Sequence, residues 1–228
     1  METKSRSLEQ IVERQVQRWQ LLKKERSEKP AAPVITFSRE PGSGGRIIAE
    51  TLANELSFDI FHQELIHQIA ESAHVHHQLL DTVDEKGMNA PEEWISSLVN
   101  ELFLVNKNRL MPDKYLKHLM KLVSIIGKHG GAVLVGRGSN FILPPERRLR
   151  LRVIASRQVR IENVAQEYRV SQEEAKQRII QTESERRAFI RKYFKADIDD
   201  PSNYDLVINT DILTVDDTVS AIRGVLKL

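Results

Sequence analysis

The residues best suited to chemistry form a glycine-rich segment, SREPGSGGR at 38–46, between an apolar run and an amphipathic stretch. Glycines let the backbone adopt conformations that are closed to other residues. Several backbone N–H groups can then converge on one anion at the positive end of the following helix. The segment therefore predicts a phosphate-binding turn formed by Gly42, Ser43, Gly44 and Gly45.

This turn departs from the usual phosphate loop, GxxxxGK[ST], in which a lysine reaches the outer phosphates and a hydroxyl holds magnesium. Alignment on the central glycines puts Gly45 at the lysine position, with Arg46 beside it. Ile47 or Ile48 stands where the hydroxyl is expected. The alternative is a strand-to-helix turn without a ligand, but placement directly after a β run favours the phosphate site.

Apolar runs of strand length alternate with segments of helical period along the chain. This alternation predicts a parallel, three-layer α/β fold. Ligands of such sheets bind beyond the carboxyl ends of the strands, so the glycine turn and Arg137 are expected at the same edge. The expected strands are 34–37, 58–61, 132–135, 149–154 and 206–208.

An amphipathic segment precedes the first strand and predicts an N-terminal helical extension, with a linker, over residues 1–30. The remaining residues, 31–228, form the main domain. The apolar stripe of the extension requires cover, from its own domain or from a second copy in a homodimer; docking on its own domain is the simpler interpretation. Its members are Ile11, Val12, Val16, Trp19 and Leu22.

Composition narrows the classes of function. The 228 residues carry a formal net charge of only +2, which lacks the single-sign field of a general nucleic-acid binder. The absence of cysteine excludes disulfides and thiolate metal sites and fits a reducing compartment. No apolar run approaches the roughly 20 residues of a bilayer span. We therefore expect a cytoplasmic protein that binds neither a nucleic acid polymer nor a membrane.

Three histidines, His74, His76 and His77, are the residues most suggestive of a metal site. Their spacing does not bring all three onto one helix face, as a shared metal would require. A solvated helix end is the favoured interpretation, and no protein-held metal is expected.

Four segments in order resemble the cytidylate kinase-like family, relatives of the bacterial cytidylate kinases within the P-loop nucleoside monophosphate kinases. The resemblance covers roughly residues 34 to 225. It implies a P-loop NTPase fold with a helical acceptor-binding insert at 61–108 and a lid region at 157–194. The segments are SREPGSGGR at 38–46, FHQELI at 61–66, VLVGRGSNFIL at 133–143, and the tail from ESERRAFIRKYF to YDLVINTDILT.

The resemblance also implies ligands and an acceptor side. ATP would lie on the glycine turn, with Mg²⁺ carried mainly by the nucleotide. Arg137 matches the GR-motif arginine that holds the acceptor nucleotide, and a guanidinium suits a phosphate or a pyrimidine carbonyl. Arg39 and His62 also fall on this side, and His62 stands where the family commonly has an aspartate.

Further arginines are expected to act on the phosphoryl group. Arg186 and Arg191 match the lid arginines, which neutralise charge as the group is transferred. Arg160 matches the arginine that begins the lid, near ATP. With no lysine in the turn, Arg46 is the nearest candidate to contact the oxygens of the donor.

These features predict ATP-dependent phosphorylation of a pyrimidine nucleoside monophosphate, a CMP-like or dCMP-like acceptor. A nucleotide-binding regulatory protein without phosphotransfer is the alternative from another class, and the missing lysine and hydroxyl favour it. A kinase with a small non-nucleotide acceptor is the third hypothesis, because fold and loop specify the donor better than the acceptor.

Overall fold

The computed structural model describes residues 8–25, 32–71, 114–145 and 148–226. The three histidines and most of the expected acceptor-binding insert lie outside the described residues. The chain divides into two compact units. The helical unit comprises 1–32 and 63–130, and the sheet unit comprises 33–62 and 131–228.

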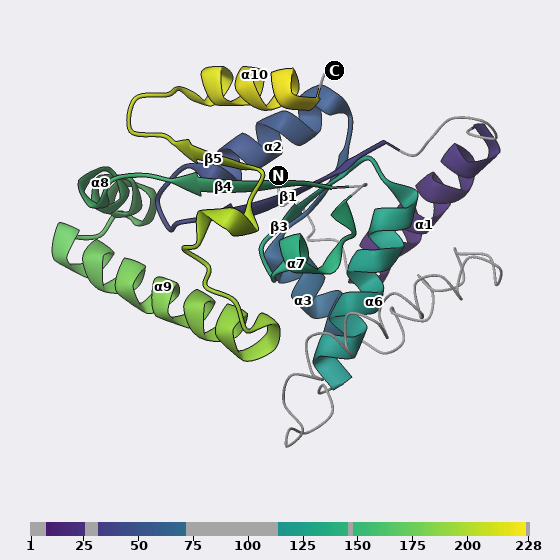
Figure 1. Ribbon diagram of the computed structural model, residues 1–228, viewed down its shortest axis with the longest axis horizontal. Coiled ribbons are helices and arrows are strands. Elements are labelled where there is room, and N and C mark those ends of the chain that lie inside the picture. The colour runs from purple at the N-terminus through teal and green to yellow at the C-terminus, as the bar shows by residue number, and fades with distance from the viewer. Residues whose placement is uncertain (1–7, 26–31, 72–113, 146–147, 227–228) are drawn as a thin grey trace, which may run out of the picture. The chain divides into compact units, whose positions relative to one another are not determined.

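The sheet unit is built on five parallel strands in the order β2-β3-β1-β4-β5. This confirms the predicted parallel α/β fold. Strands β1, β3, β4 and β5 are labelled in Figure 1. The central strand β1 pairs with β3 on one side and β4 on the other. The elements in chain order are β1 (Val34–Arg39), α2 (Gly45–Leu56), β2 (Asp59–Phe61), β3 (Ala132–Val135), α7 (Ser139–Ile142), β4 (Arg148–Ile154), α8 (Arg157–Tyr168), α9 (Gln172–Phe194), the 3-10 helix η2 (Pro201–Asn203), β5 (Leu206–Asn209) and α10 (Val215–Leu226).

The two faces of strands β1 and β4 carry different side chains. Phe37 pairs in register with Leu151, and both join the apolar core that α2 and α10 complete on one face. The next pair, Ser38 and Arg152, points to the opposite face because successive side chains of a strand alternate. Helix α9 lies on that second side of the sheet (Figure 1). The sequence RLRLRV thus builds a core with one face and a polar layer with the other.

Two helix starts in this unit follow their capping residues. The Ser171 hydroxyl accepts a hydrogen bond from the Glu174 backbone N–H at 3.2 Å and caps α9. Thr214 and Asp217 form a reciprocal pair before α10, in which each side chain accepts a bond from the other residue's backbone N–H. These caps fix where the two helices begin.

The helical unit contains α1 (Leu8–Glu25), α3 (Gln63–Glu71) and α6 (Lys114–His129). Val12 and Trp19 of the α1 stripe are 2% and 3% exposed, whereas Ile11 is 38% exposed. The Trp19 ring stacks on His129 with ring centroids 4.0 Å apart. The stripe is therefore covered at Val12 and Trp19, and Trp19 fastens α1 to the end of α6.

The burial of Trp19 gives a stability prediction. Trp19→Ala removes a buried ring and leaves a cavity, so the free energy of unfolding should fall by about 3–5 kcal/mol. Ile11→Ala, on the exposed edge of the same helix, should cost less than about 1 kcal/mol. Urea denaturation followed by circular dichroism measures both, and equal losses in the two variants would contradict this packing.

Candidate functional site

The glycine turn has the backbone geometry of an anion site. Gly42 and Gly44 have φ angles of +79° and +72°, in the left-handed region that glycine alone adopts without strain. Gly44 is the N-cap of α2 and no side chain caps that helix. The first N–H groups of a helix have no intrahelical acceptor, so the start of α2 offers backbone donors of the kind that bind anions.

Neighbouring side chains hold the carbonyl groups of the turn. Asn163 Nδ2 donates to Gly42 O at 2.8 Å, and Thr210 Oγ1 donates to Ser43 O at 2.9 Å. Ser43 is 1% exposed, and its hydroxyl donates to Glu40 O at 2.9 Å. A carbonyl and the N–H of the same peptide point in opposite directions. Fixing the Ser43 carbonyl from Thr210 therefore turns the Gly44 N–H the other way, whereas the Ser43 N–H donates to Glu40 O at 3.3 Å.

The backbone at Gly45 packs where a lysine side chain would begin. A Cβ placed there would lie 2.7 Å from Arg39 Cβ and 3.2 Å from Val153 Cβ. A larger residue requires the end of β1 or β4 to shift. Ile47, one candidate for the hydroxyl position, is 57% exposed, and Ile48, the other, is in the core. The turn supplies backbone donors without an ammonium or a magnesium-binding hydroxyl.

Arg46 and His62 meet on one carboxylate. Arg46 Nε donates to Glu50 Oε1 at 3.0 Å, and His62 Nε2 lies 3.3 Å from the same oxygen. The Arg46 side chain is 63% exposed. The structure thus brings these two residues together at the first turns of α2, with Arg46 lying along the helix toward Glu50.

Arg160 is buried and held by carboxylates. It is 8% exposed; its Nε donates to Ala155 O at 3.0 Å and lies 3.3 Å from Glu40 Oε2. Its Nη1 donates to Glu183 on α9. A Cβ at Gly42 would lie 2.5 Å from Arg160 O. Arg160 therefore lies against the glycine turn, and its guanidinium joins the turn to α9.

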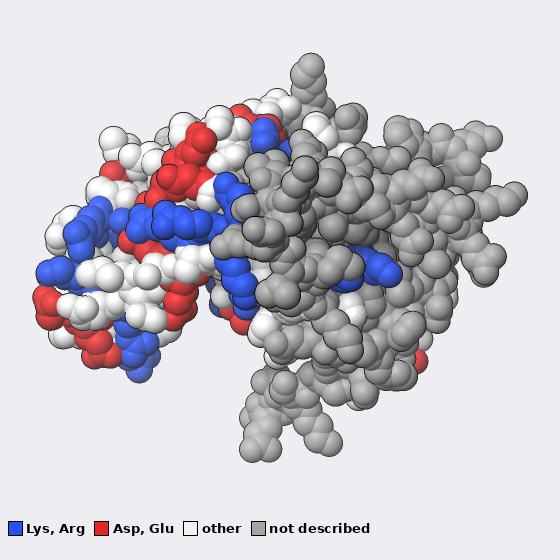
Figure 2. All heavy atoms as spheres, turned by 60° about the horizontal axis from the view of Figure 1, so that its bottom comes forward, with Lys and Arg blue, Asp and Glu red and all other residues white. Residues whose placement is uncertain are grey.

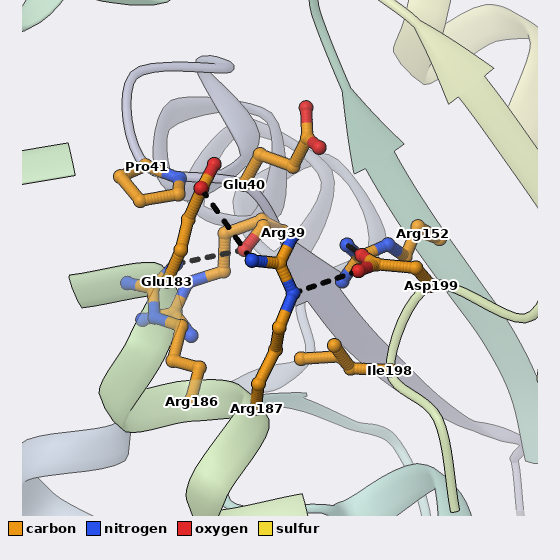
Figure 3. Close-up of a pocket in the computed structure, with 9 residues that line it drawn as sticks. All are labelled: Arg39, Glu40, Pro41, Arg152, Glu183, Arg186, Arg187, Ile198 and Asp199. Carbon is orange, nitrogen blue, oxygen red and sulfur yellow. Dashed lines mark hydrogen bonds and ion pairs between the residues drawn. The ribbon is translucent and has the colours of Figure 1, made fainter. Parts of the chain in front are cut away.

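A pocket lies beyond the carboxyl end of β1 and is drawn in Figure 3. Four arginines from β1, β4 and α9 line it together with three carboxylates. Arg186 Nη1 donates to Arg39 O at 2.7 Å, so the structure brings these two predicted site residues together. We call this the arginine pocket; its lining is Arg39, Glu40, Pro41, Arg152, Glu183, Arg186, Arg187, Ile198 and Asp199.

Sequence reasoning missed Arg152 and Arg187 as pocket residues. Arg152 is 5% exposed and donates to Ser38 Oγ at 2.8 Å and to Asp199 Oδ1 at 2.7 Å. Arg187 Nε donates to Asp199 Oδ2 at 2.8 Å, and this bond raises the pKa of Arg187 above its usual value. Strand alternation placed Arg152 on the polar face, but no local signal distinguished Arg187. Arg191, which the resemblance favoured, is exposed and does not line the pocket.

Arg137 occupies a strained turn after β3. Gly136, Arg137 and Gly138 have φ angles of +83°, +54° and +68°. A non-glycine residue in this region is costly and marks a candidate functional position. The Arg137 guanidinium lies 5.4 Å from the centre of the Phe189 ring, and its buried Nε has no hydrogen-bond partner among the described residues. An unsatisfied buried donor suits a ligand oxygen.

Charge is mixed over the described part of the surface. In Figure 2, Lys and Arg side chains lie beside Asp and Glu and do not form a field of one sign.

Among the described residues, no group of three or more His, Asp or Glu could hold a metal ion. None of the described helices is both long and apolar enough to span a bilayer. The positive groups near the carboxyl end of β1 are therefore the local arginines and the start of α2.

A parallel α/β sheet with a glycine turn after its central strand defines this protein as a P-loop-like α/β protein. A model of the cytidylate kinase-like family matches residues 34–212, so the chain belongs to the cytidylate kinase-like family. No curated protein matches the chain.

Three solved structures of low sequence identity align with the chain. An uncharacterized protein from Eubacterium ventriosum aligns with a TM-score of 0.63 and 15% identity, over 86% of this chain and 98% of the other. Shikimate kinase from Bacteroides thetaiotaomicron aligns with a TM-score of 0.44 and 12% identity, over 87% and 100%. TT1252 from Thermus thermophilus gives 0.44 and 14%, over 87% and 98%. The first of these supports the fold.

The close packing at Gly45 predicts a loss of stability on substitution. Gly45→Ala should lower the free energy of unfolding by about 1–3 kcal/mol, because the added methyl overpacks the contact with Arg39 and Val153. Gly224→Ala in α10 meets no atom within 4 Å, and it should be neutral or stabilising by up to about 1 kcal/mol. Denaturant unfolding of both variants checks the opposite signs, and two similar values would contradict the packing at Gly45.

Proposed function

We propose that this protein transfers the γ-phosphoryl group of ATP to a pyrimidine nucleoside monophosphate resembling CMP or dCMP. One observation carries the proposal: a backbone anion site and the arginine pocket both adjoin the carboxyl end of β1, joined by the segment Arg39–Pro41. Phosphoryl transfer needs two phosphate-bearing molecules placed in line. Membership of the cytidylate kinase-like family supports the nucleotide class of both.

The donor phosphates would lie on the glycine turn. Backbone N–H groups at the start of α2 would bind the oxygens, with the helix dipole favouring their negative charge. An oxygen of the acceptor phosphate attacks the γ-phosphorus, the bond to the bridging oxygen breaks, and ADP leaves. Guanidinium groups neutralise the charge that develops, and no covalent intermediate with the protein is required. Arg186 is the α9 residue best placed for this role, because it is fixed to Arg39 O.

The acceptor would be held by Arg137 and by the pocket arginines. The Nε donor of Arg137 and its half-buried guanidinium suit a phosphate or a pyrimidine carbonyl oxygen. His62 is directed at Glu50 and replaces the aspartate common in the family. Mg²⁺ would arrive with ATP, carried mainly by its phosphates; among the described residues, no group of three or more His, Asp or Glu could hold a metal ion.

A nucleotide-binding regulator without phosphotransfer is a second candidate. The packing at Gly45 favours it, because that packing excludes the lysine that follows the transferred group in most phosphate loops. In such a protein, nucleotide binding would alter the position of α9 without turnover.

A panel of acceptors separates these functions. Full-length protein is incubated with ATP and Mg²⁺ and with CMP, dCMP, UMP, AMP or shikimate, and ADP release is followed by a coupled assay. Turnover restricted to CMP or dCMP is the expected result. Turnover only with another acceptor would replace the acceptor class. Nucleotide binding by calorimetry without turnover would replace phosphotransfer by regulation.

Arg137 provides a residue-level test. Arg137→Ala should weaken CMP binding by about tenfold or more, the usual loss for a charge-assisted hydrogen bond, and leave ATP affinity within about twofold. Arg223→Ala is the matched control, since Arg223 is exposed on α10 and pairs only weakly with Glu55 at 3.1 Å. Calorimetry of each ligand measures the split, and a loss confined to ATP would remove Arg137 from the acceptor side.

A further inference from the structure

Arg187 differs from the other arginines of the pocket in how its nitrogens are used. Its Nε is bound to Asp199 Oδ2 at 2.8 Å, and its Nη1 is 3.9 Å from Glu183 Oε2, beyond hydrogen-bond distance. Among the described residues, no group accepts a hydrogen bond from its two terminal nitrogens. The side chain is 46% exposed. Arg187 is therefore held at the base of its guanidinium and open at the tip.

The neighbouring arginines are committed to the protein. Arg152 uses both terminal nitrogens, on Ser38 and Asp199, and is almost fully buried. Arg186 donates a terminal nitrogen to Arg39 O. In Figure 3 the guanidinium of Arg187 lies between Glu183 and Asp199, in the middle of the pocket. Arg187 is therefore better able than Arg152 or Arg186 to present a two-nitrogen edge to a ligand.

Asp199 is fixed from several sides. Its Oδ1 accepts from the buried Arg152, and its backbone N–H donates to Asp197 Oδ1 at 3.0 Å. The preceding carbonyl, Ile198 O, accepts from the Tyr204 hydroxyl at 2.7 Å. Tyr204 is buried, and this burial raises its pKa, so the hydroxyl keeps its proton and remains a donor. The series of hydrogen bonds from Ser38 through Arg152 to Asp199 thus sets the position of Arg187.

We propose that the arginine pocket is a subsite for a phosphoryl or pyrophosphoryl anion, in which Arg187 contacts the ligand and Asp199 is its positioning residue. The inference rests on the proposed function and adds Arg187 to Arg186 as a residue of α9 that acts on a phosphate in the pocket. Four guanidinium groups face three carboxylates in the pocket, which leaves one net positive charge for an anion. A fork held at Nε can offer both Nη groups to two oxygens of one phosphate.

Binding of inorganic pyrophosphate to the full-length protein tests the subsite without requiring turnover. Arg187→Ala should weaken pyrophosphate binding by about tenfold or more in calorimetry. Arg178→Ala is the matched control: Arg178 is on the same helix, is 50% exposed and pairs with Glu174 at 2.9 Å. Its affinity should stay within about twofold of the wild type. An Arg187→Ala protein that binds pyrophosphate as the wild type does, or a wild type that does not bind it, overturns the proposal.

The positioning role of Asp199 has its own readout. Asp199→Asn keeps the shape of the side chain but weakens its hold on Arg187 Nε, so pyrophosphate affinity should fall by several-fold. Asp199→Asn combined with Arg187→Ala should bind no more weakly than Arg187→Ala alone, because Asp199 acts through Arg187. Additive losses would show that Asp199 acts otherwise and would overturn its role. Failure of every acceptor in the turnover panel, with pyrophosphate binding still dependent on Arg187, would count against the proposed function and leave the subsite in place.

Discussion

The candidate site depends on one buried guanidinium, that of Arg160. It joins Glu40, just before the glycine turn, to Glu183 on α9, and it also donates to Ala155 O at the end of β4. A buried charge is tolerated only with partners of opposite sign, and removing one partner leaves the other uncompensated. The turn, the β4–α8 connection and the helix that carries Arg186 and Arg187 are therefore constrained by the same ion pairs. The resemblance suggested a ligand contact for Arg160, whereas the geometry supports a structural connection.

The same two strands provide stability and a site because a strand presents alternate residues to opposite faces. On one face, Ile35 and Phe37 of β1 and Leu151 and Val153 of β4 pack against α2 and α10. On the other, Ser38 accepts a hydrogen bond from Arg152, and its Oγ lies 3.2 Å from the Tyr204 hydroxyl oxygen. Since both sets belong to one ladder, a register shift would move arginines into the apolar core. The core therefore fixes the register that places Arg152 beside Asp199.

The periodicity of apolar residues predicted the fold well, but it did not predict which side chains form ion pairs with one another. Apolar runs are local signals, and they identified the parallel strands. Ion pairs are not local: Arg160 meets Glu183, 23 residues away, and Arg152 meets Asp199, 47 residues away. The sequence also did not show whether Arg187 or Arg191 lines the pocket, because the helical pattern of α9 does not indicate which arginine faces it. The loop after α9, which supplies Asp199, decides that.

The absence of a lysine from the turn changes how anion binding is linked to the rest of the fold. In a phosphate loop with the sequence GK[ST], the lysine that contacts the phosphates belongs to the loop itself. Here Arg39 and Val153 pack against Gly45 and leave no space for a side chain, and Arg46 lies along α2 and donates to Glu50. The cations of the arginine pocket come instead from β1, β4 and α9, and two of them are on α9. If the turn binds the donor as proposed, the negative charge of the donor phosphates is balanced partly by the turn and partly by the arginines of α9. The contacts that hold α9 in place then contribute to the binding energy. Glu40, Glu183 and Asp199 supply those contacts, so carboxylates beside an anion site here support its binding by holding the arginines in position.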